Sequence, residues 1–263
     1  MPLLQLAARP CWPCVPTSKR IPPPVTGPEV DSALDLLATG EMTVQGRLVD
    51  ASNATLYCAI SAAGREANCV YKPIAGERPL WDFPDGTLAA REAAAYAVSA
   101  ASGWDLVPPT VIRDGPFGVG MVQLWIEVDD EVDLSALSRS DHPDLARMAV
   151  LDAVINNADR KGGHLLPVTS GRVYGIDHGV CFSTEDKLRT LLWQWRGDPL
   201  PLEAVEVLER LRDDLAATLG ETLVALLDRR EVRATTRRVN RLLRHGTYPL
   251  PSQDWPAIPW PPF

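Results

Sequence analysis

The hydrophobic and polar positions follow different patterns in the first and second halves of the chain. In the first half, stretches with strand character alternate with Gly, Asn or Ser turn material, at residues 42–49, 55–61, 68–72, 111–113 and 118–126. The first three predict an antiparallel meander. Helical spacing occurs at 32–39, before Gly40, and in an alanine-rich segment at 88–101 that Thr87 can cap. This half therefore predicts strands, one long helix and then further strands.

The second half has the pattern of a mainly helical structure. Apolar residues lie nearly all round the predicted helix at 143–157, so this helix must be buried. It runs into a polar loop at 156–164, and the elements expected after that loop are two short strands at 165–168 and 172–176 and two helices at 202–218 and 221–243. A small strand-rich lobe is thus expected to precede a larger helical lobe.

Prolines gather in two terminal stretches, 1–28 and 249–263, which together hold most of the 24 prolines. Proline lacks a backbone donor and fixes φ, so the first stretch is expected to be a disordered tail. The second contains Trp255, Trp260 and Phe263, which favour an extended tail that docks along the surface.

Length and composition are those of an ordinary globular protein. The chain has 263 residues, 46% hydrophobic and 23% charged, which excludes disorder throughout. Its formal net charge of -8 opposes binding to nucleic acid, because phosphate neutralisation needs a basic surface. No apolar run is long enough to span a bilayer, and no basic stretch leads into an apolar one at the N-terminus. We therefore expect a cytoplasmic protein without a transmembrane segment.

The five cysteines do not form the pattern of a disulfide framework, because their number is odd and their spacing is irregular. Cys11 and Cys14 form a CxxC pair in the first proline-rich stretch. A redox role would need a strand-to-helix junction, and a zinc site would need a second ligand pair. The sequence shows neither such a junction nor a second ligand pair. We therefore favour an incidental pair of cysteines in a protein of a reducing compartment.

Lys72 and Glu92 are the first residues with a chemical signal. Lys72 ends an apolar strand, and Glu92 is the only acidic side chain between Ala89 and Ser102 in the following helix. A carboxylate can fix the flexible lysine stem so that the ammonium meets phosphate oxygens. The alternative is a surface lysine and an exposed helical glutamate.

Asp159 and Asp177 form a second candidate pair. Each lies in a loop beside the predicted hairpin, Asp159 after the buried helix and Asp177 directly after a strand. Phosphoryl transfer requires one carboxylate to position the hydroxyl nucleophile and another to hold Mg²⁺ across the phosphates. The structural alternative is that Asp159 belongs to a turn and that Asp177 ends a strand. The chemical interpretation is favoured because all four features occur in the right order.

These residues resemble the motifs of the phosphoinositide 3- and 4-kinase superfamily, and of the related HipA-type bacterial kinases. The Asn-Ala-Asp-Arg segment around Asp159 matches the start of that family's catalytic loop, and the Ile-Asp-His-Gly segment around Asp177 matches its metal-binding motif. The order of the predicted elements resembles that of the family over residues 40–245. Within the superfamily, the chain looks most like an actinobacterial branch. The resemblance implies an α+β, two-lobed, protein-kinase-like fold. From the pattern along the chain we expect a small antiparallel β-rich N-lobe at 29–126 and a mainly helical C-lobe at 127–248.

The resemblance also implies roles for the four candidate residues. Asp159 would be the catalytic aspartate and Asp177 the Mg²⁺ ligand. Lys72 would be the phosphate-binding lysine and Glu92 its partner. The implied cofactors are ATP and Mg²⁺ or Mn²⁺.

Two positions depart from the family pattern. His164 stands where the family has a metal-binding Asn. A neutral imidazole can ligate a divalent ion, although Mg²⁺ prefers oxygen, so His164 is either a ligand or a structural histidine. Weaker Mg²⁺ binding, a preference for Mn²⁺ and an inactive nucleotide binder all stay open. The loop at 46–53 lacks a glycine-rich run, so backbone amides near Ser52 and Asn53 are the candidates for phosphate contacts.

Lys161 and the loop at 76–86 each have a chemical and a structural interpretation, and Arg160 has a structural one. Lys161 lies two residues after the catalytic aspartate, where it either neutralises charge on the transferred phosphoryl group or is a solvated loop lysine. Arg160 is a candidate for a structural ion pair with a carboxylate of the C-lobe. The loop at 76–86 carries Trp81 and Phe83 and is interpreted as a lid, with aromatic packing on the lobe surface as the alternative.

A basic stripe follows the last predicted helix, where arginines recur every four residues at Arg229, Arg233, Arg237 and Arg241. Such a stripe can face an anionic lipid surface or an acidic partner. A solvated helix face that balances acidic stretches elsewhere is favoured.

The sequence therefore predicts an ATP-dependent phosphotransferase that passes the γ-phosphate to a hydroxyl of a protein, a metabolite or a lipid. Lipid is the least favoured acceptor, because the chain is acidic and has no anchor. The alternatives are a nucleotide-binding pseudokinase that serves as a scaffold, and a kinase-fold enzyme that transfers AMP.

Overall fold

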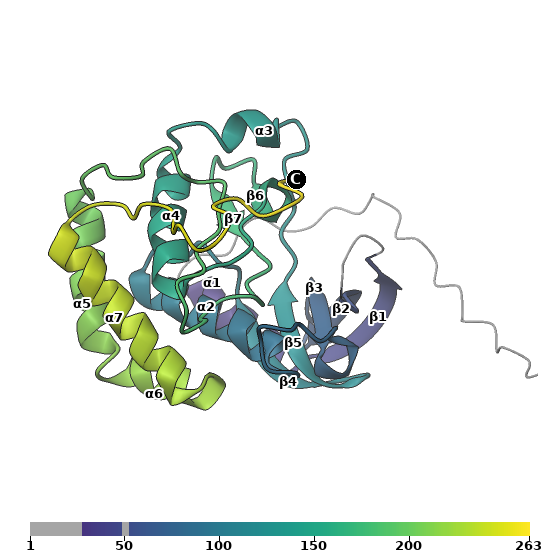
Figure 1. Cartoon of the computed structure of the whole chain (residues 1–263). Coiled ribbons are helices and arrows are strands. Elements are labelled where there is room, and N and C mark those ends of the chain that lie inside the picture. The colour runs from purple at the N-terminus through teal and green to yellow at the C-terminus, as the bar shows by residue number, and fades with distance from the viewer. Residues whose placement is uncertain (1–27, 49–52) are drawn as a thin grey trace, which may run out of the picture.

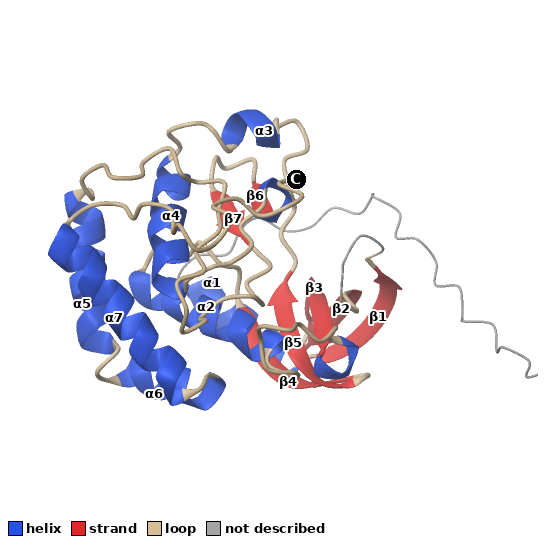
Figure 2. Ribbon diagram, viewed as in Figure 1, coloured by secondary structure: helices blue, strands red, loops and turns tan. Residues whose placement is uncertain are grey.

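The computed structural model describes residues 28–48 and 53–263. The expectations for the tail at 1–27, for the CxxC pair and for Ser52 lie outside the described residues. Figure 1 shows a strand-rich lobe beside a larger helical lobe, and Figure 2 shows the same division by secondary structure. The α+β, two-lobed fold expected from the sequence is confirmed.

A five-stranded antiparallel sheet forms the smaller lobe. Its strands are β1 (Glu41–Arg47), β2 (Leu56–Ala62), β3 (Arg65–Pro73), β4 (Thr110–Gly115) and β5 (Gly118–Leu124), in the order β1-β2-β3-β5-β4. Alternate side chains of β2 and β3 are buried, as the period of two in a strand requires. The helix α1 (Pro28–Thr39) covers this face with Leu36 and Leu37. The register places Lys72 of β3 opposite Met121 of β5.

The helix α2 (Leu88–Ser102) packs against both lobes. Its C-terminus is set by Gly103, whose φ of 72° is in the left-handed region that glycine adopts without steric cost. One side of α2 contacts β4 and β5, while Ala94, Ala95 and Val98 are buried in the core of the helical lobe. Residues on α2 are thereby fixed at the boundary between the lobes.

The helical lobe is built around α4 (Pro143–Ile155), which is buried as its apolar pattern predicts. Its other elements are α3 (Leu134–Leu137), the hairpin of β6 (Leu165–Pro167) and β7 (Val173–Gly175), α5 (Leu202–Asp214), α6 (Thr218–Leu226) and α7 (Arg229–His245). Two single 3₁₀ turns are η1 (Ile74–Gly76) in the sheet lobe and η2 (Gly162–His164) before β6.

The single helix predicted at 221–243 is wrong, because two helices, α6 and α7, occupy this region. Asp228 breaks the pattern: its carboxylate accepts the backbone N–H of Arg230, and the side chain of Glu231 accepts the backbone N–H of Asp228. This reciprocal capping box satisfies the free donors at the start of α7 and so favours a new helix over a continuous one.

The segment at 249–263 contains no helix or strand and crosses the helical lobe in Figure 1, and its end contacts η2. Thr190 donates its backbone N–H to the carbonyl of Ala257 (3.0 Å), and Gly162 donates to the carbonyl of Pro262 (2.9 Å). The ring of Phe263 packs so closely on Gly162 that a side chain at position 162 would have no room. The segment is therefore bound to the loop that carries Asp159.

Within the described ranges, no helix combines the length and the apolar composition needed to cross a bilayer.

Candidate active site

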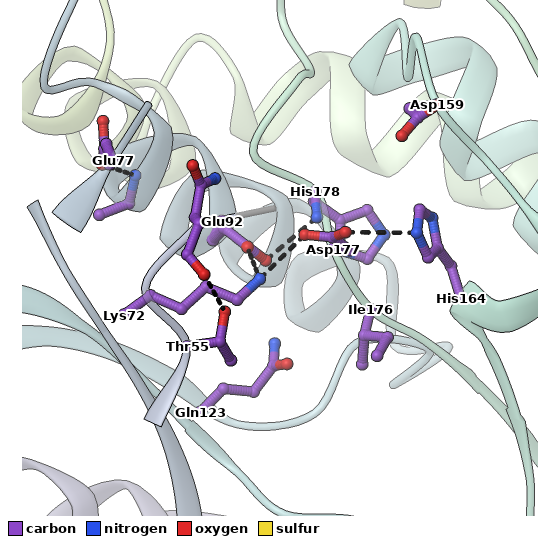
Figure 3. Close-up of polar contacts among 12 residues, drawn as sticks. Thr55, Lys72, Glu77, Glu92, Gln123, Asp159, His164, Ile176, Asp177 and His178 are labelled. Atoms are coloured by element: carbon purple, nitrogen blue, oxygen red, sulfur yellow. Dashed lines mark hydrogen bonds and ion pairs between the residues drawn. The ribbon is translucent and has the colours of Figure 1, made fainter. Parts of the chain in front are cut away.

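Lys72, Glu92 and Asp177 meet at the boundary of the two lobes. The ammonium of Lys72, at the end of β3, lies 2.6 Å from Glu92 Oε1 on α2 and 2.9 Å from Asp177 Oδ1 after β7. Figure 3 shows the three side chains pointing toward one another. The structure thus brings together three of the residues selected from the sequence, and the alternative of an exposed helical glutamate is excluded because the Glu92 side chain is only 3% exposed.

Glu92 holds this arrangement from both of its oxygens. While one oxygen accepts from Lys72, Oε2 accepts the backbone N–H of His178 (3.0 Å). Asp177 itself has a φ of 63°, in the left-handed region that aspartate tolerates better than most residues. Local strain at a loop carboxylate held by several partners is typical of functional sites.

The charges of the three groups stabilise one another. Burial alone lowers the pKa of Lys72, but Asp177 and Glu92 more than offset it, so this pKa lies above its ordinary value. The nearby Lys72 ammonium holds the pKa of Asp177 well below its usual range. Burial raises the pKa of Glu92, against the opposing effect of Lys72. At neutral pH, an ammonium and an ionised Asp177 carboxylate therefore face each other.

The loop that carries Asp159 is anchored in the protein interior. Arg160 is fully buried and donates from Nε and Nη2 to the carboxylate of Asp152 on α4 (3.0 and 2.9 Å). Its Nη1 donates to the carbonyl of Ile176 (3.0 Å), and Nη2 lies 2.6 Å from His178 Nε2. Arg160 thus has the structural role considered for it above, and it links the Asp159 loop to the residues on both sides of Asp177.

Asp159 lines the same cavity as Lys72 and Asp177, and its side chain is partly exposed. Asn157 positions the backbone of Asp159 by accepting its N–H at 2.9 Å. The Lys161 ammonium lies 3.1 Å from Asp159 Oδ2, and the two side chains are 24% and 28% exposed. Lys161 is therefore paired with Asp159 rather than free in solvent, which leaves it close to any group that Asp159 contacts.

His164 lies on the far side of Asp177 from Lys72 (Figure 3), with Nε2 at 3.2 Å from Asp177 Oδ2. Burial lowers the pKa of His164, so its ring is neutral at physiological pH. Its Nδ1 accepts the backbone N–H of Lys161 (3.4 Å), which assigns the ring proton to Nε2. In this tautomer His164 donates to Asp177 and does not present a lone pair there.

The donor set nevertheless fits a divalent cation whose coordination is completed by phosphates. Among the residues described here, no three His, Cys, Asp or Glu side chains cluster as a preformed metal site. Mg²⁺ is usually held by one or two carboxylates together with waters and substrate phosphates, and does not need such a cluster. The Asp177 side chain is 46% exposed toward the cleft and can supply a carboxylate oxygen.

A cavity of about 320 Å³ lies beside these residues, within the size range of small-molecule sites. Residues of both lobes line it, including Asn53, Lys72, Glu92, Asp159 and Asp177. All of the candidate residues that the structure describes therefore lie in or next to one cleft.

Two cleft residues, Glu77 and Arg78, were not predicted. The Glu77 carboxylate accepts the backbone N–H groups of Leu88 and Ala89 at the start of α2 (3.1 and 2.8 Å), and Arg78 donates its backbone N–H to Asn53 Oδ1 (2.9 Å). Asn53 therefore uses its side chain to position the loop opposite. The sequence signal that could have found them is the pair of adjacent opposite charges that Glu77 and Arg78 form in the 76–86 loop.

The two aromatic residues of the 76–86 loop do not line the cavity. Phe83 is buried beneath the guanidinium of Arg91, which lies 4.8 Å from the ring centroid. Trp81 is exposed and stacks on Trp255, with ring centroids 6.1 Å apart. The Lys187 ammonium lies 5.3 Å from the Trp81 centroid and 4.6 Å from that of Trp255. These contacts agree with the surface-packing alternative.

The sequence comparisons identify the family. The family model of phosphatidylinositol 3- and 4-kinase matches residues 126–242. Protein Rv2133c of Mycobacterium tuberculosis is 46% identical, over 87% of this chain and 94% of the relative. The chain belongs to the phosphatidylinositol 3- and 4-kinase-like superfamily.

Solved structures of low sequence identity share the fold of this superfamily member. The Golgi casein kinase, in a crystal structure with Mn/ADP bound, superimposes with a TM-score of 0.54 at 15% identity, over 82% of this chain and 75% of the other. The hydra Fam20 structure with sugar gives a TM-score of 0.52 at 13% identity, over 82% and 88%. These similarities confirm the kinase-like fold.

Proposed function

We propose that this kinase-like protein transfers the γ-phosphoryl group of ATP to a hydroxyl acceptor. The observation that carries the proposal is the contact of Lys72 with both Glu92 and Asp177 at a cleft lined by the two lobes. A lysine fixed between two carboxylates, one of which is buried, suits phosphate oxygens next to a metal-binding carboxylate. The Mn/ADP bound to the Golgi casein kinase supports nucleotide and metal as the ligands of this cleft.

Each residue of the cleft has a distinct task in this proposal. Lys72 binds phosphate oxygens, and Glu92 keeps the Lys72 stem in place. Asp177 holds Mg²⁺ or Mn²⁺, with His164 donating to its second oxygen. When bound, the divalent ion supplies positive charge that neutralises the phosphates.

Asp159 orients the acceptor hydroxyl and accepts its proton. A loop carboxylate that is only partly exposed and held by Asn157 is fixed well enough for that task. Lys161, which is 3.1 Å from Asp159, places positive charge beside the transferred phosphoryl group. We expect a protein or a small metabolite as acceptor rather than a lipid, because the chain carries a net charge of -8.

Labelled ATP tests the reaction class. The purified protein is incubated with Mg²⁺ or Mn²⁺ and either γ- or α-labelled ATP, with acceptor protein mixtures and hydroxyl metabolites. Transfer of the γ-label supports the proposal, whereas transfer of the α-label shows AMP transfer. A protein that binds neither metal–ATP complex in a thermal-shift titration at millimolar ATP would contradict nucleotide use altogether.

Two variants separate the tasks of the aspartates. Asp177→Ala should weaken metal-dependent ATP binding and abolish turnover. Asp159→Asn should keep ATP affinity while turnover falls about 10²- to 10⁴-fold, as expected for loss of a positioned acid or base. The exposed Asp130 offers a matched control, Asp130→Asn, which should change neither quantity. Full turnover in Asp159→Asn, or unchanged metal-dependent binding in Asp177→Ala, would refute the assigned tasks.

One observation favours a second candidate, a nucleotide-binding pseudokinase. His164 occupies the position where the superfamily has a metal-binding Asn, and its ring proton points at Asp177 rather than leaving a lone pair for a second metal contact. His164→Asn distinguishes the two functions. A gain of γ-label transfer from an otherwise silent protein would favour the pseudokinase.

A further inference from the structure

A second cavity, of about 270 Å³, lies between α7 and the segment that follows the Asp177 motif. Its lining includes Thr184, Asp186 and four arginines of α7, which are Arg237, Arg238, Arg241 and Arg244. In the described part of the chain, this cavity and the nucleotide cleft have no lining residue in common. The basic stripe seen in the sequence thus contributes to a distinct concave site.

The spacing of the arginines explains why they meet at one cavity. Positions 237, 241 and 244 are four and three residues apart, so their side chains share one face of α7. Like charges at this spacing repel one another and destabilise an isolated helix. An anion between the three guanidinium groups would offset this repulsion and so stabilise the helix with its arginines on one face.

Arg238 is the most unusual of the four because it is buried, with only 7% of the residue exposed. It donates to the carbonyls of Val154 (2.8 Å) and Ser183 (3.1 Å) and to the hydroxyl of Thr235 (2.9 Å). All three acceptors are neutral. Burial, followed by the nearby charge of Arg241, lowers the pKa of Arg238 to about 10. The carboxylate of Asp186 opposes this lowering in part, but the three groups that accept hydrogen bonds from Arg238 are all uncharged, so the desolvation of this buried cation is only partly offset.

The carboxylates at this cavity are already engaged. Asp186 Oδ2 lies 2.9 Å from Arg241, and Glu185 Oε2 lies 3.2 Å from Lys187. Over residues 28–48 and 53–263, Arg237, Arg238 and Arg244 form no ion pair. Three guanidinium groups therefore remain without a carboxylate partner around one hollow.

We propose that this cavity is a phosphate-binding site, which takes a phosphate monoester carried either by Thr184 or by a separate ligand. Guanidinium groups bind phosphate through paired, charge-assisted hydrogen bonds, and several of them around one hollow favour a dianion. Thr184 is exposed and lines the same cavity, so a phosphate on its Oγ1 would lie among the arginines. In that case Oγ1 forms a bond to the γ-phosphorus of ATP, the bond to the leaving oxygen of ADP breaks, and the hydroxyl proton is released.

The same segment is linked to the loop that carries Asp159. The side chain of Asn156 donates to the carbonyl of Ser183 (3.0 Å) and accepts the backbone N–H of Lys187 (3.1 Å). Asn156 also ends α4, just before the catalytic loop. A phosphate in the cavity would hold residues 183–187 against both α7 and this loop.

Melting curves with inorganic phosphate test the site. The protein is first checked by intact mass to carry no phosphate and is then melted with millimolar phosphate or with chloride of equal ionic strength. At phosphate about tenfold above its dissociation constant, we expect the melting temperature to rise by about 4 °C. The double variant Arg237→Ala/Arg241→Ala should lose this shift. The matched variant Arg229→Ala/Arg233→Ala removes the same charge from the same helix and should keep it.

The outcomes separate the site from general charge effects. A shift that depends on the cavity arginines alone supports the proposal. Equal shifts in all three proteins, or no shift in the unmodified protein, would overturn it.

The source of the phosphate is identified in a second arm. Peptide mapping of the protein from its native cells, with Thr184→Val as the control, tests for phosphate on Thr184. Thr184 is the source if phosphate is found on it, and if the phosphorylated protein melts at a higher temperature and no longer responds to inorganic phosphate. A cavity-dependent shift in a protein that lacks phosphothreonine assigns a separate phosphorylated ligand.

Discussion

Asp152→Asn removes the only carboxylate that Arg160 contacts in the described chain while keeping the shape of the side chain. Asp152 and Arg160 are both 0% exposed, and two hydrogen bonds of 2.9 and 3.0 Å join them. Removing one partner of such a pair leaves a buried charge uncompensated, at a cost of about 3–5 kcal/mol. For a protein of this size each kcal/mol lowers the melting temperature by about 2–4 °C, so a decrease of about 10 °C is expected.

An exposed ion pair serves as the control. Asp35 and Arg65 also form a pair, but their side chains are 56% and 37% exposed. Solvent screens such pairs, so Asp35→Asn should cost only about 0–1 kcal/mol. Thermal melts followed by circular dichroism give the melting temperatures of the wild type, Asp152→Asn and Asp35→Asn, and so compare the buried pair with the exposed pair.

A double variant tests the cause of the instability. In Asp152→Leu/Arg160→Met no buried charge remains, and much of the stability should return, because apolar replacement of a buried ion pair is often neutral. Turnover should not return, because Ile176 and His178 lose the guanidinium that positions them. If Asp152→Asn melts within a degree of the wild type, or if the double variant is as active as the wild type, the reasoning fails.

Two further predictions concern packing and the α2–α7 contact. Gly162→Ala would force the Phe263 ring away from the loop that carries Asp159, so it should destabilise the protein by about 1–3 kcal/mol and expose residues 249–263 to protease. Adding Phe263→Ala should reverse part of the decrease in melting temperature, and no reversal would contradict the steric cause. Glu231→Gln should cost about 3 kcal/mol in urea unfolding, because Arg91 is 1% exposed and loses its carboxylate; a change below about 1 kcal/mol would place the pair among solvent-screened contacts.

The regular elements of the fold were predictable where one periodicity dominated. Strand alternation located β1, β2 and β5, and the all-round apolar pattern located α4. The beginning of β3 was missed by three residues because its hairpin turns at Ala63 and Gly64, with φ of 50° and 77°. Asn-Gly or Asp-Gly is the usual signal of that turn, and alanine at the first position is not.

Of the candidate site, the residues with a distinct chemical signature were predictable and their environments were not. Lys72, Glu92 and Asp177 were selected by type and order, and they lie in contact. A structural ion pair of Arg160 with a C-lobe carboxylate was predicted and is confirmed, but the sequence does not show which carboxylate is the partner or that both side chains are fully buried. The tautomer of His164 depends on a backbone donor, which no sequence pattern reports.

The stack of Trp81 on Trp255 gives the protein an intrinsic optical reporter. One indole belongs to the loop between β3 and α2, the other to the segment that crosses the helical lobe, and the Lys187 ammonium lies close to both rings. Separation of the two elements changes the polarity and the charge around both indoles at once. A change of Trp81 to Phe isolates their contribution from that of the other tryptophans among the eight of the chain. Movement between the lobes can thus be followed by stopped-flow emission without attaching a dye.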